Sequence, residues 1–387
     1  MKKKIELKKI VWIVLLFLLS IGQLQRIQLT NRIAFYLHDI LISGWVLWAI
    51  INKKINLKKY QLIIVFLSWA FISLLLNNFL HGWQLRPFLY FARLIVYLLF
   101  GASLSGKKNL QTILIGSGFF VAVLGWIMYL LMPDSRHLGM YGWDNHYFRL
   151  IGPFLDPNFT GLILSLSFVY LFQQFSLLKT IKNKIFYQKI FLLINYTVIF
   201  SAILFTYSRS SYLSFLIGLF FLGWQEWLKH NKKQLALIIS LGTLFLICLP
   251  FLPRPGGEGV NLTRTSTAKT RIHSNQSVLD NMATKDWIIG KGLFVTTINQ
   301  QAIDKPMHAS FPDNIIVFLL TSTGIVGLGM AGIILLKFYL LNWKEKIKLA
   351  QLNMVLAHSL FNLSLFEPFT LLFLLIYFSL NRINSNE

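Results

Sequence analysis

The sequence is poor in cysteine and in charge, and each shortage excludes a class of protein. Cys248 is the only cysteine among 387 residues, which excludes intrachain disulfides and multi-cysteine metal sites. Charged residues make up 13% of the chain, whereas about a quarter is usual in soluble domains. Hydrophobic residues make up 55%, more apolar surface than a soluble domain of this length buries. We therefore expect a membrane protein.

Nucleotide-binding and metal-binding motifs are also absent. The chain has no Walker loop, no Rossmann glycine fingerprint, no Asp-x-Asp pair and no His/Cys ligand spacing. Only 14 residues are acidic, and they are scattered, so a carboxylate-bound metal is not expected. The sequence predicts a protein that works without nucleotide hydrolysis, metal or cofactor.

The chain does contain long apolar blocks, most of them of a length that crosses a hydrocarbon core of about 30 Å. They lie near 10–25, 33–52, 60–80, 87–104, 109–132, 158–178, 190–206, 211–228, 234–252, 314–341, 349–366 and 368–381. These blocks predict an all-α, polytopic integral membrane protein of about 12 transmembrane helices, the first one retained rather than cleaved. We divide it into a membrane domain at 1–252 (spans 1–9), a long extracytoplasmic loop with an amphipathic helix at 253–312, and a second membrane part at 313–387 (spans 10–12).

Basic residues give the blocks an orientation. The net charge is +23, and the basic residues stand between apolar blocks, which indicates topology rather than a nucleic-acid partner. With the N-terminus inside, the inner segments hold 22 basic residues (21 lysines and Arg382). The short outer segments hold six: Arg26, Arg32, Arg86, Arg136, Arg149 and Arg209. The positive-inside rule then places both termini in the cytoplasm and 253–312 outside a bacterial cytoplasmic membrane.

Arginine and lysine also separate between the two sides. Ten of the eleven arginines are outer, because Arg93, Arg254, Arg264 and Arg271 join the six named above, whereas 22 of the 26 lysines are inner. Arginine grips phosphate with two parallel donors and keeps its charge. The pattern indicates either snorkelling toward lipid headgroups or an outward-facing site for a phosphorylated, membrane-embedded substrate.

Two outer turns carry polar candidates beside the start of a span. In Thr206-Tyr-Ser-Arg-Ser-Ser-Tyr212, Ser208 and Arg209 adjoin the N-terminus of the next helix, where anions are favoured. The turn is either a phosphate cradle or a plain capping turn. In the segment from Arg149 to Gly161, Asn158 either binds substrate or belongs to a plain turn in which Asn158 or Asp156 caps the next helix.

Other candidates are ionisable groups in or beside the apolar blocks. His308, in the long loop, has the near-neutral pKa of a general base. Asp39, Arg93 and Glu367 lie within spans or at their outer ends, where such groups are functional or pair with one another. An Asp39–Arg93 pair is expected to be structural. His358 either faces the same cavity or bonds between helices.

Three pieces, in this order, resemble the O-antigen ligase and Wzy-type polysaccharide polymerase family. They are Gly152…Pro157-Asn158, Thr206-x-Ser-Arg209, and Arg271…Gly290-x-Gly292…His308…Gly324-x-x-Gly327. Two departures stand out. Ala309 follows His308 where the family commonly has Asn, and Ser322-Thr323 precede the glycine run where Glu is frequent. The second departure puts the acidic position in doubt or moves its role to Asp313 or Glu367.

The resemblance implies a glycosyltransferase that uses a saccharide on polyprenyl pyrophosphate and needs neither metal nor nucleotide. Its catalytic residues correspond to Arg209, Arg271 and His308, and we expect Arg93, Arg149, Asn158, Ser208, Asp39 and Glu367 to bind substrate. The expected partners are the lipid-linked glycan donor, a glycan acceptor, membrane lipids and other polysaccharide-assembly proteins.

The acceptor decides between two activities. A second lipid-linked repeat makes the enzyme a polymerase, and a lipid, wall polymer or protein makes it a ligase. Usage rich in Lys, Ile and Asn is typical of an AT-rich, Gram-positive genome without lipid A, which favours a capsule or exopolysaccharide polymerase.

Two rival classes remain at this stage. A lipid-linked sugar flippase needs no catalytic residues, but transporters usually show repeats and midplane coupling carboxylates, and Asp39 is the only acidic residue deep in a block. A structural scaffold leaves the outer arginines unexplained.

Overall fold

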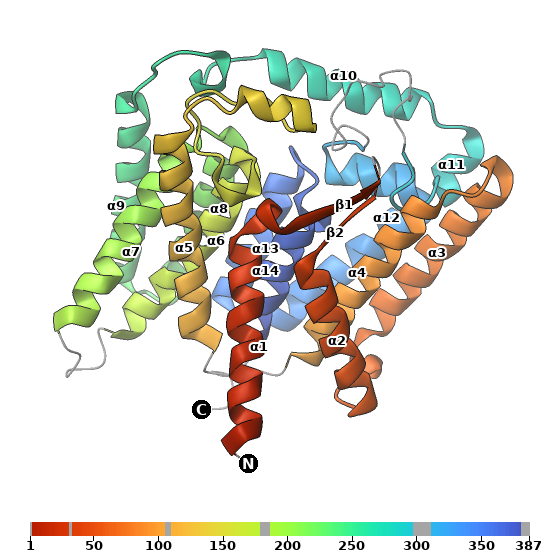
Figure 1. Ribbon diagram of the computed structural model, residues 1–387, viewed down its shortest axis with the longest axis horizontal. Coiled ribbons are helices and arrows are strands. Elements are labelled where there is room, and N and C mark those ends of the chain that lie inside the picture. Colours follow the sequence, from red (N-terminus) through yellow and green to blue (C-terminus); the bar gives the residue numbers. More distant parts are fainter. Residues whose placement is uncertain (1, 31–32, 105–109, 179–185, 297–310, 381–387) are drawn as a thin grey trace.

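The computed structural model describes residues 2–30, 33–104, 110–178, 186–296 and 311–380, and helices dominate it (Figure 1). Each of the twelve predicted apolar blocks contains one α-helix. They are α1 (Lys2–Ser20), α2 (Leu37–Ile51), α3 (Gln61–His81), α4 (Leu85–Ser103), α5 (Leu110–Leu131), α6 (Pro157–Leu178), α7 (Phe186–Phe205), α8 (Arg209–Leu228), α9 (Lys232–Cys248), α12 (Ile315–Asn342), α13 (Lys346–Ser359) and α14 (Pro368–Leu380).

Five of these helices are long and apolar enough to cross a membrane, namely α3, α4, α5, α9 and α12. Shorter apolar helices lie within α1, α2, α6, α7 and α14. The helical membrane architecture is therefore confirmed, whereas the count of twelve spans and the loop topology stay predictions.

A β-hairpin corrects the all-α prediction at one place. Strands β1 (Arg26–Thr30) and β2 (Ile33–Tyr36) pair antiparallel, with Arg26 opposite Tyr36. The second apolar block thus begins as a strand, and α2 starts only at Leu37. Because Ile33-Ala-Phe-Tyr36 is apolar, a hydropathy pattern alone did not separate a strand from a helix start.

The eleventh block also ends earlier than predicted. Helix α13 stops at Ser359, and the chain continues through a turn and one 3-10 turn at Ser364–Phe366 before α14 begins. Asn362, Ser364 and Glu367 lie in this short connection, where their polar groups serve the site described below.

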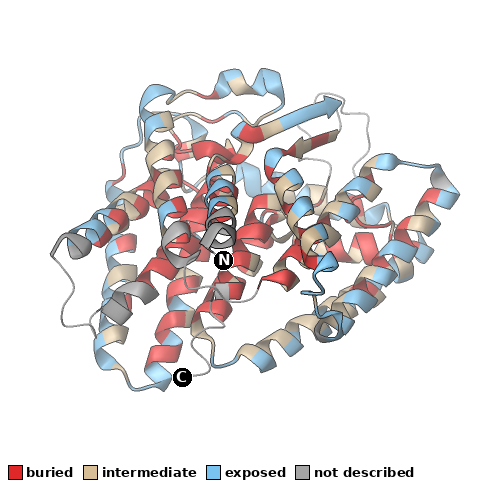
Figure 2. Cartoon of the chain, turned by 60° about the horizontal axis from the view of Figure 1, so that its bottom comes forward, coloured by how far each residue is buried: buried red, intermediate tan, exposed pale blue. Residues whose placement is uncertain are grey.

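The core lies around α6, α8, α13 and α14. Buried residues concentrate in the middle of the molecule, and exposed ones on the surrounding helices (Figure 2). Close packing holds α8 on α13, because Gly218 lies against the Met354 side chain and Ser214 Oγ donates to the Met354 carbonyl. The polar residues of the central helices are thereby held at fixed positions.

The long segment after α9 crosses one end of the bundle. Helix α10 (Ser266–Asp280) runs over the top of Figure 1 from the α9 side toward α11 (Thr284–Ile289), whereas α1 begins at the opposite end. A helix is therefore present within 253–312, and its apolar residue Ile272 is 65% exposed.

Helix α12 is broken at Gly324, which has φ 66° and ψ −175°. The break frees carbonyls that an apolar surrounding cannot hydrate. The segment after α11 satisfies two of them, since Lys291 N donates to Thr321 O and Gly292 N to Ser322 O, both at 2.8 Å. Helix α3 supplies further donors: Trp69 Nε1 lies 2.9 Å from Thr323 O, and Ser73 Oγ lies 3.1 Å from Ser322 O. At this break, hydrogen bonds therefore join the long segment to α12, and we call this contact the joint.

We expect Gly324→Ala to prevent folding of this joint. That backbone conformation is nearly exclusive to glycine, because it costs other residues about 1–3 kcal/mol of conformational strain. A Cβ there would also lie 2.0 Å from Ile288 O. The yield of monodisperse protein in detergent, measured by fluorescence-detected size exclusion, should fall several-fold. Gly329→Ala is the matched control in the same helix, because its Cβ meets nothing within 4 Å. Equal yields for the two variants would contradict the account.

Candidate functional site

Arg149 hydrogen-bonds to the backbone of the turn between α7 and α8. Its Nε donates to Thr206 O at 3.0 Å, and its Nη2 donates to Tyr207 O at 3.3 Å. Arg149 is only 7% exposed. The Tyr207 hydroxyl in turn donates to Pro253 O at the start of the long segment. Arg149, predicted to bind substrate, thus positions the turn that carries Ser208 and Arg209.

Two polar caps meet beside this turn. Asp156 Oδ1 accepts from Asn158 N at 2.6 Å and from Phe159 N at 3.0 Å, so Asp156 caps α6 as one of the two alternatives predicted. Ser208 caps α8 by accepting from Ser211 N. The Ser208 hydroxyl also donates to Asn158 Oδ1 at 2.7 Å. Asn158 and Ser208, predicted separately to bind substrate, therefore lie together and join the first turns of two helices.

Four arginines gather where α8 faces α10, and we call Arg149, Arg209, Arg264 and Arg271 the first arginine group. Arg209 Nη1 donates to Arg264 O at 2.6 Å, and Arg209 Nη2 donates to Thr267 Oγ1 at 3.0 Å. Arg264 itself donates to the carbonyls of Glu258, Gly259 and Asn261. The structure thus brings both predicted catalytic arginines, Arg209 and Arg271, to α10.

The charges of this group oppose one another. Burial, and then the nearby Arg264 guanidinium, lowers the pKa of Arg149 to about 9. Burial, followed by the charges of Arg209 and Arg271, also lowers the pKa of Arg264. A lowered pKa of a base means that its positive charge is disfavoured where it stands. A bound anion would relieve that repulsion, so the group is suited to phosphate.

Arg271 is connected to a buried polar network. Its Nε lies 3.3 Å from Asp313 Oδ2, and its Nη2 donates to Asn362 Oδ1 at 3.0 Å. Asn362 Nδ2 donates to Ser210 Oγ at 3.0 Å. His358 Nε2 lies 3.2 Å from the same hydroxyl. His358 is fully buried, so it bonds between helices, as one of its two predicted alternatives states.

The opposite ring nitrogen completes the network. His358 Nδ1 lies 2.5 Å from Ser364 Oγ, whose hydroxyl is also 3.1 Å from Asn362 O. The side chains of Asn362, Ser210, His358 and Ser364 are all hydrogen-bonded within this network. Such a satisfied network holds its members rigidly. The network fixes the connection between α13 and α14. It thereby holds Asn362, which orients Arg271.

Asp39 and Arg93 form the predicted ion pair, with 3.1 Å between Arg93 Nη2 and Asp39 Oδ2. Asp39 is further occupied by the Tyr97 hydroxyl and by Tyr36 N, which donates at 2.9 Å. Arg93 also donates to Ala34 O at 2.7 Å. The pair therefore attaches the β-hairpin to α4 and α2, which is the structural role expected of it.

Glu367 lies at the start of α14, near Phe369, whose ring packs 5.0 Å from the Tyr36 ring and 5.3 Å from the Phe154 ring. It accepts from Thr370 N at 2.7 Å at the start of α14. Burial, opposed by its hydrogen bonds with Thr370, raises the pKa of the Glu367 carboxyl to about 7, and the Asp156 carboxylate adds to the rise. The charge of Glu367 also acts on the Tyr36 hydroxyl of the hairpin, whose pKa burial raises to about 12. A carboxyl that titrates near neutrality is suited to proton transfer.

His308, predicted to be catalytic, lies outside the described residues. Among the described residues, one His/Asp group has metal-ligand geometry: single ligand atoms of Asp144, His146 and Asp156 lie within 4.8 Å of one another. Sequence spacing did not reveal this group, because Asp156 joins it only through the fold. Arg149 Nη1 lies 3.5 Å from His146 Nδ1, and its positive charge opposes a cation there.

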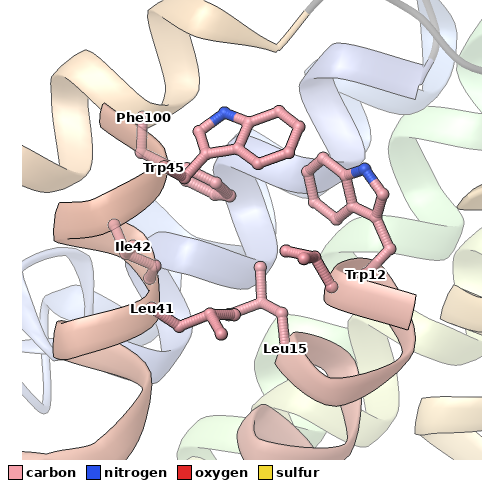
Figure 3. A pocket seen from close by; sticks show the side chains of 7 residues that line it. Trp12, Leu15, Leu41, Ile42, Trp45 and Phe100 are labelled. Atoms are coloured by element: carbon pink, nitrogen blue, oxygen red, sulfur yellow. The ribbon is translucent and has the colours of Figure 1, made fainter. Parts of the chain in front are cut away.

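An apolar gap elsewhere offers no alternative site. It lies between α1, α2 and α4, and Figure 3 shows Trp12, Leu15, Leu41, Ile42, Trp45 and Phe100 turned toward it, with Val11 completing the lining. The lining residues carry no charge, so the gap provides nothing that binds phosphate. It is a packing feature of the first helices.

Fold and site together define a class: a helical membrane protein with a cation-rich polar site where α8, α10 and the α13–α14 connection meet. Residues 194–332 match the family model for O-antigen ligase (Wzy_C). The resemblance to the O-antigen ligase and Wzy-type polymerase family is thereby confirmed over that stretch, which implies a glycan-transferring membrane enzyme with a lipid-linked glycan and an acceptor as substrates. No curated protein and no solved structure matches the chain.

Sequence reasoning missed the residues that support the site. Arg264 was counted only as an outer charge, and Asn362 was not singled out. Asn362 falls inside an apolar block, where a polar residue with hydrogen-bonding capacity needs a partner. That requirement was a usable signal, but it does not identify Arg271 as the partner 91 residues away.

We expect Arg149→Ala to destabilise the protein more than Arg209→Ala does. Loss of Arg149 leaves two buried carbonyls without donors, at about 1–3 kcal/mol each, whereas the partly exposed Arg209 leaves acceptors that water reaches. Thermal unfolding in detergent, followed by tryptophan fluorescence, should show a drop of several degrees only for Arg149→Ala. Equal shifts would show that Arg149 does not hold the turn.

Proposed function

We propose that the protein polymerises polyprenyl-pyrophosphate-linked oligosaccharide repeats into capsular polysaccharide or exopolysaccharide on the outer face of the cytoplasmic membrane. The observation that carries this proposal is the first arginine group, in which Arg209, Arg264 and Arg271 stand close enough to repel one another beside the α8 N-terminus. A diphosphate supplies the negative charge that such a group lacks. The matching family supports glycan transfer as the reaction.

In the proposed reaction, an acceptor hydroxyl oxygen attacks the anomeric carbon of the donor sugar. The new C–O bond forms as the bond between that carbon and the diphosphate breaks, and the diphosphate leaves with the bonding electrons. Arg209 and Arg271 stabilise this developing charge, in the way that positioned donors do in other transfer reactions. The acceptor proton passes to His308, with Glu367 as the second candidate because of its pKa near 7.

Ligation to a lipid, wall polymer or protein is the alternative activity, and the same donor chemistry serves it. The two reactions differ only in the acceptor. A flippase is the second alternative. A flippase would move the same lipid-linked sugars across the membrane without breaking a bond. It therefore needs no proton acceptor beside the arginines.

We expect Arg209→Ala, Arg271→Ala and His308→Ala each to lower polymer formation by about 10²–10³-fold, because each removes a group that acts on the leaving diphosphate or the acceptor. Lipid-linked glycans are extracted from cells in which the variant is the only copy. Single repeats should accumulate on the outer face. Lys269→Ala is the matched control, since Lys269 is an exposed cation on the same helix α10.

The same extraction separates the alternatives. Long chains that stay on the carrier lipid indicate a ligase, and single repeats retained on the inner face indicate a flippase. Undiminished long polymer in all three variants would refute the assignment of the site.

The proposal includes a reaction that needs no metal. Polymer formation by purified protein in EDTA should equal that in the untreated sample, because guanidinium groups neutralise the diphosphate in place of a cation. A loss restored by one divalent cation would contradict this, and Asp144→Asn would then test the Asp144, His146 and Asp156 group as its site.

A further inference from the structure

A second set of arginines lies on α4. Arg86, Tyr90 and Arg93 are spaced four and three residues apart, so they follow one face of the helix. This face runs between an exposed stripe at Leu85, Leu89 and Ala92 and a buried stripe at Pro87, Phe91 and Leu94. The face with Arg86, Tyr90 and Arg93 is therefore half-buried, between the surface and the core.

Aromatic rings hold these arginines in place. The guanidinium carbons of Arg86 and Arg93 each lie 5.4 Å from the centre of the Tyr90 ring, on which they converge. Arg93 also lies 5.4 Å from the Tyr36 ring of the hairpin. Arg86 lies 5.6 Å from the Phe311 ring. Stacking on a ring fixes the plane of a guanidinium while its donors stay available.

Arg26 joins the set from the hairpin. It is the strand partner of Tyr36, and its charge acts on the Tyr36 hydroxyl. Its guanidinium lies 5.2 Å from the Trp143 ring. We call Arg26, Arg86 and Arg93 the second arginine group.

The second arginine group is only partly neutralised. Asp39 pairs with Arg93 at 3.1 Å but also accepts from Tyr97 and Tyr36 N. Within the described part of the chain, Arg86 has no carboxylate within ion-pair distance, and its buried Nε has no hydrogen-bond partner. Arg86 is thus a positive charge with an unused Nε donor at the start of α4.

The turn that carries Glu367 packs against both regions. Glu367 accepts from Thr370 N at 2.7 Å, and the Phe369 ring beside it lies 5.0 Å from the Tyr36 ring, on which Arg93 stacks. The same Phe369 ring lies 5.3 Å from the Phe154 ring, in the Gly152–Phe154 turn that follows Arg149 of the first group. A carboxyl thus lies on a turn that contacts the surroundings of both arginine groups, an arrangement that suits two anionic substrates brought to one point of reaction.

We propose that the second arginine group binds the diphosphate of the acceptor, at a site separate from the first arginine group that holds the donor diphosphate. The inference rests on the proposed function, in which the acceptor is a second lipid-linked repeat, and adds where that acceptor binds. The acceptor's diphosphate keeps its bond to the sugar, so its site needs fixed charge in the ground state rather than stabilisation of a leaving group. Ring-stacked arginines supply that fixed charge. The alternative ligand for the second arginine group is the phosphate of a membrane phospholipid.

The test counts bound lipid diphosphates. Purified protein in detergent is mixed with farnesyl diphosphate, and native mass spectrometry reports the number bound per chain, with farnesol as the probe that lacks phosphate. We expect two bound molecules in the unmodified protein, one in Arg86→Gln, one in Arg271→Gln, and none in the double variant. Lys269→Gln should retain two. The molecule retained by each single variant also shows that the variant is folded.

The outcomes separate this inference from the proposed function. One bound molecule that is lost in Arg271→Gln and kept in Arg86→Gln overturns the acceptor site and leaves the donor site standing. No binding of farnesyl diphosphate, or equal binding of farnesol, overturns both. Phosphatidylglycerol that displaces only the Arg86-dependent molecule at equal concentration makes the second group a phospholipid site and overturns the acceptor assignment.

Discussion

In an apolar bundle, every backbone group that a helix end releases needs a partner, because no water reaches it. Two places in this chain meet that requirement across long distances. Arg149 supplies donors to the carbonyls of Thr206 and Tyr207 in the turn before α8. Lys291 N and Gly292 N supply donors to the carbonyls before the break in α12. Both joints connect the long segment to the bundle, since the Tyr207 hydroxyl donates to Pro253 O and Lys291 N and Gly292 N donate to α12.

The second constraint is charge. Eleven arginines and 14 acidic residues are spread over 387 positions, yet the fold gathers four arginines around α10, where the carboxylates of Asp156, Asp313 and Glu258 are few and mostly occupied by caps or pairs. Such repulsion is disfavoured unless it serves binding. Main-chain carbonyls orient the guanidinium groups of Arg149, Arg209 and Arg264 without neutralising them, whereas Arg271 is paired with Asp313.

Individual residues show how far sequence reasoning reaches. The Asp156 cap, the place of Ser208 before α8 and the Asp39–Arg93 pair were all predictable, since each follows from neighbours along a helix start or from the shared depth of two spans. The hairpin was missed because apolar strand and apolar helix start look alike in hydropathy. The Arg271–Asn362–Ser210–His358 chain was missed because its members come from three separate elements.

By itself the sequence determined that the chain forms apolar helices of a membrane protein, and it predicted that the arginines favour one side, because hydropathy and charge act on each segment separately. It also carried a resemblance that a family model matches at 194–332, a stretch that includes two of the three short motifs. Only the tertiary structure decided which arginines share a site, which carboxylates neutralise them and which histidines are buried. Those outcomes depend on contacts between residues that lie far apart in the chain, and packing of the whole bundle decides which of them meet.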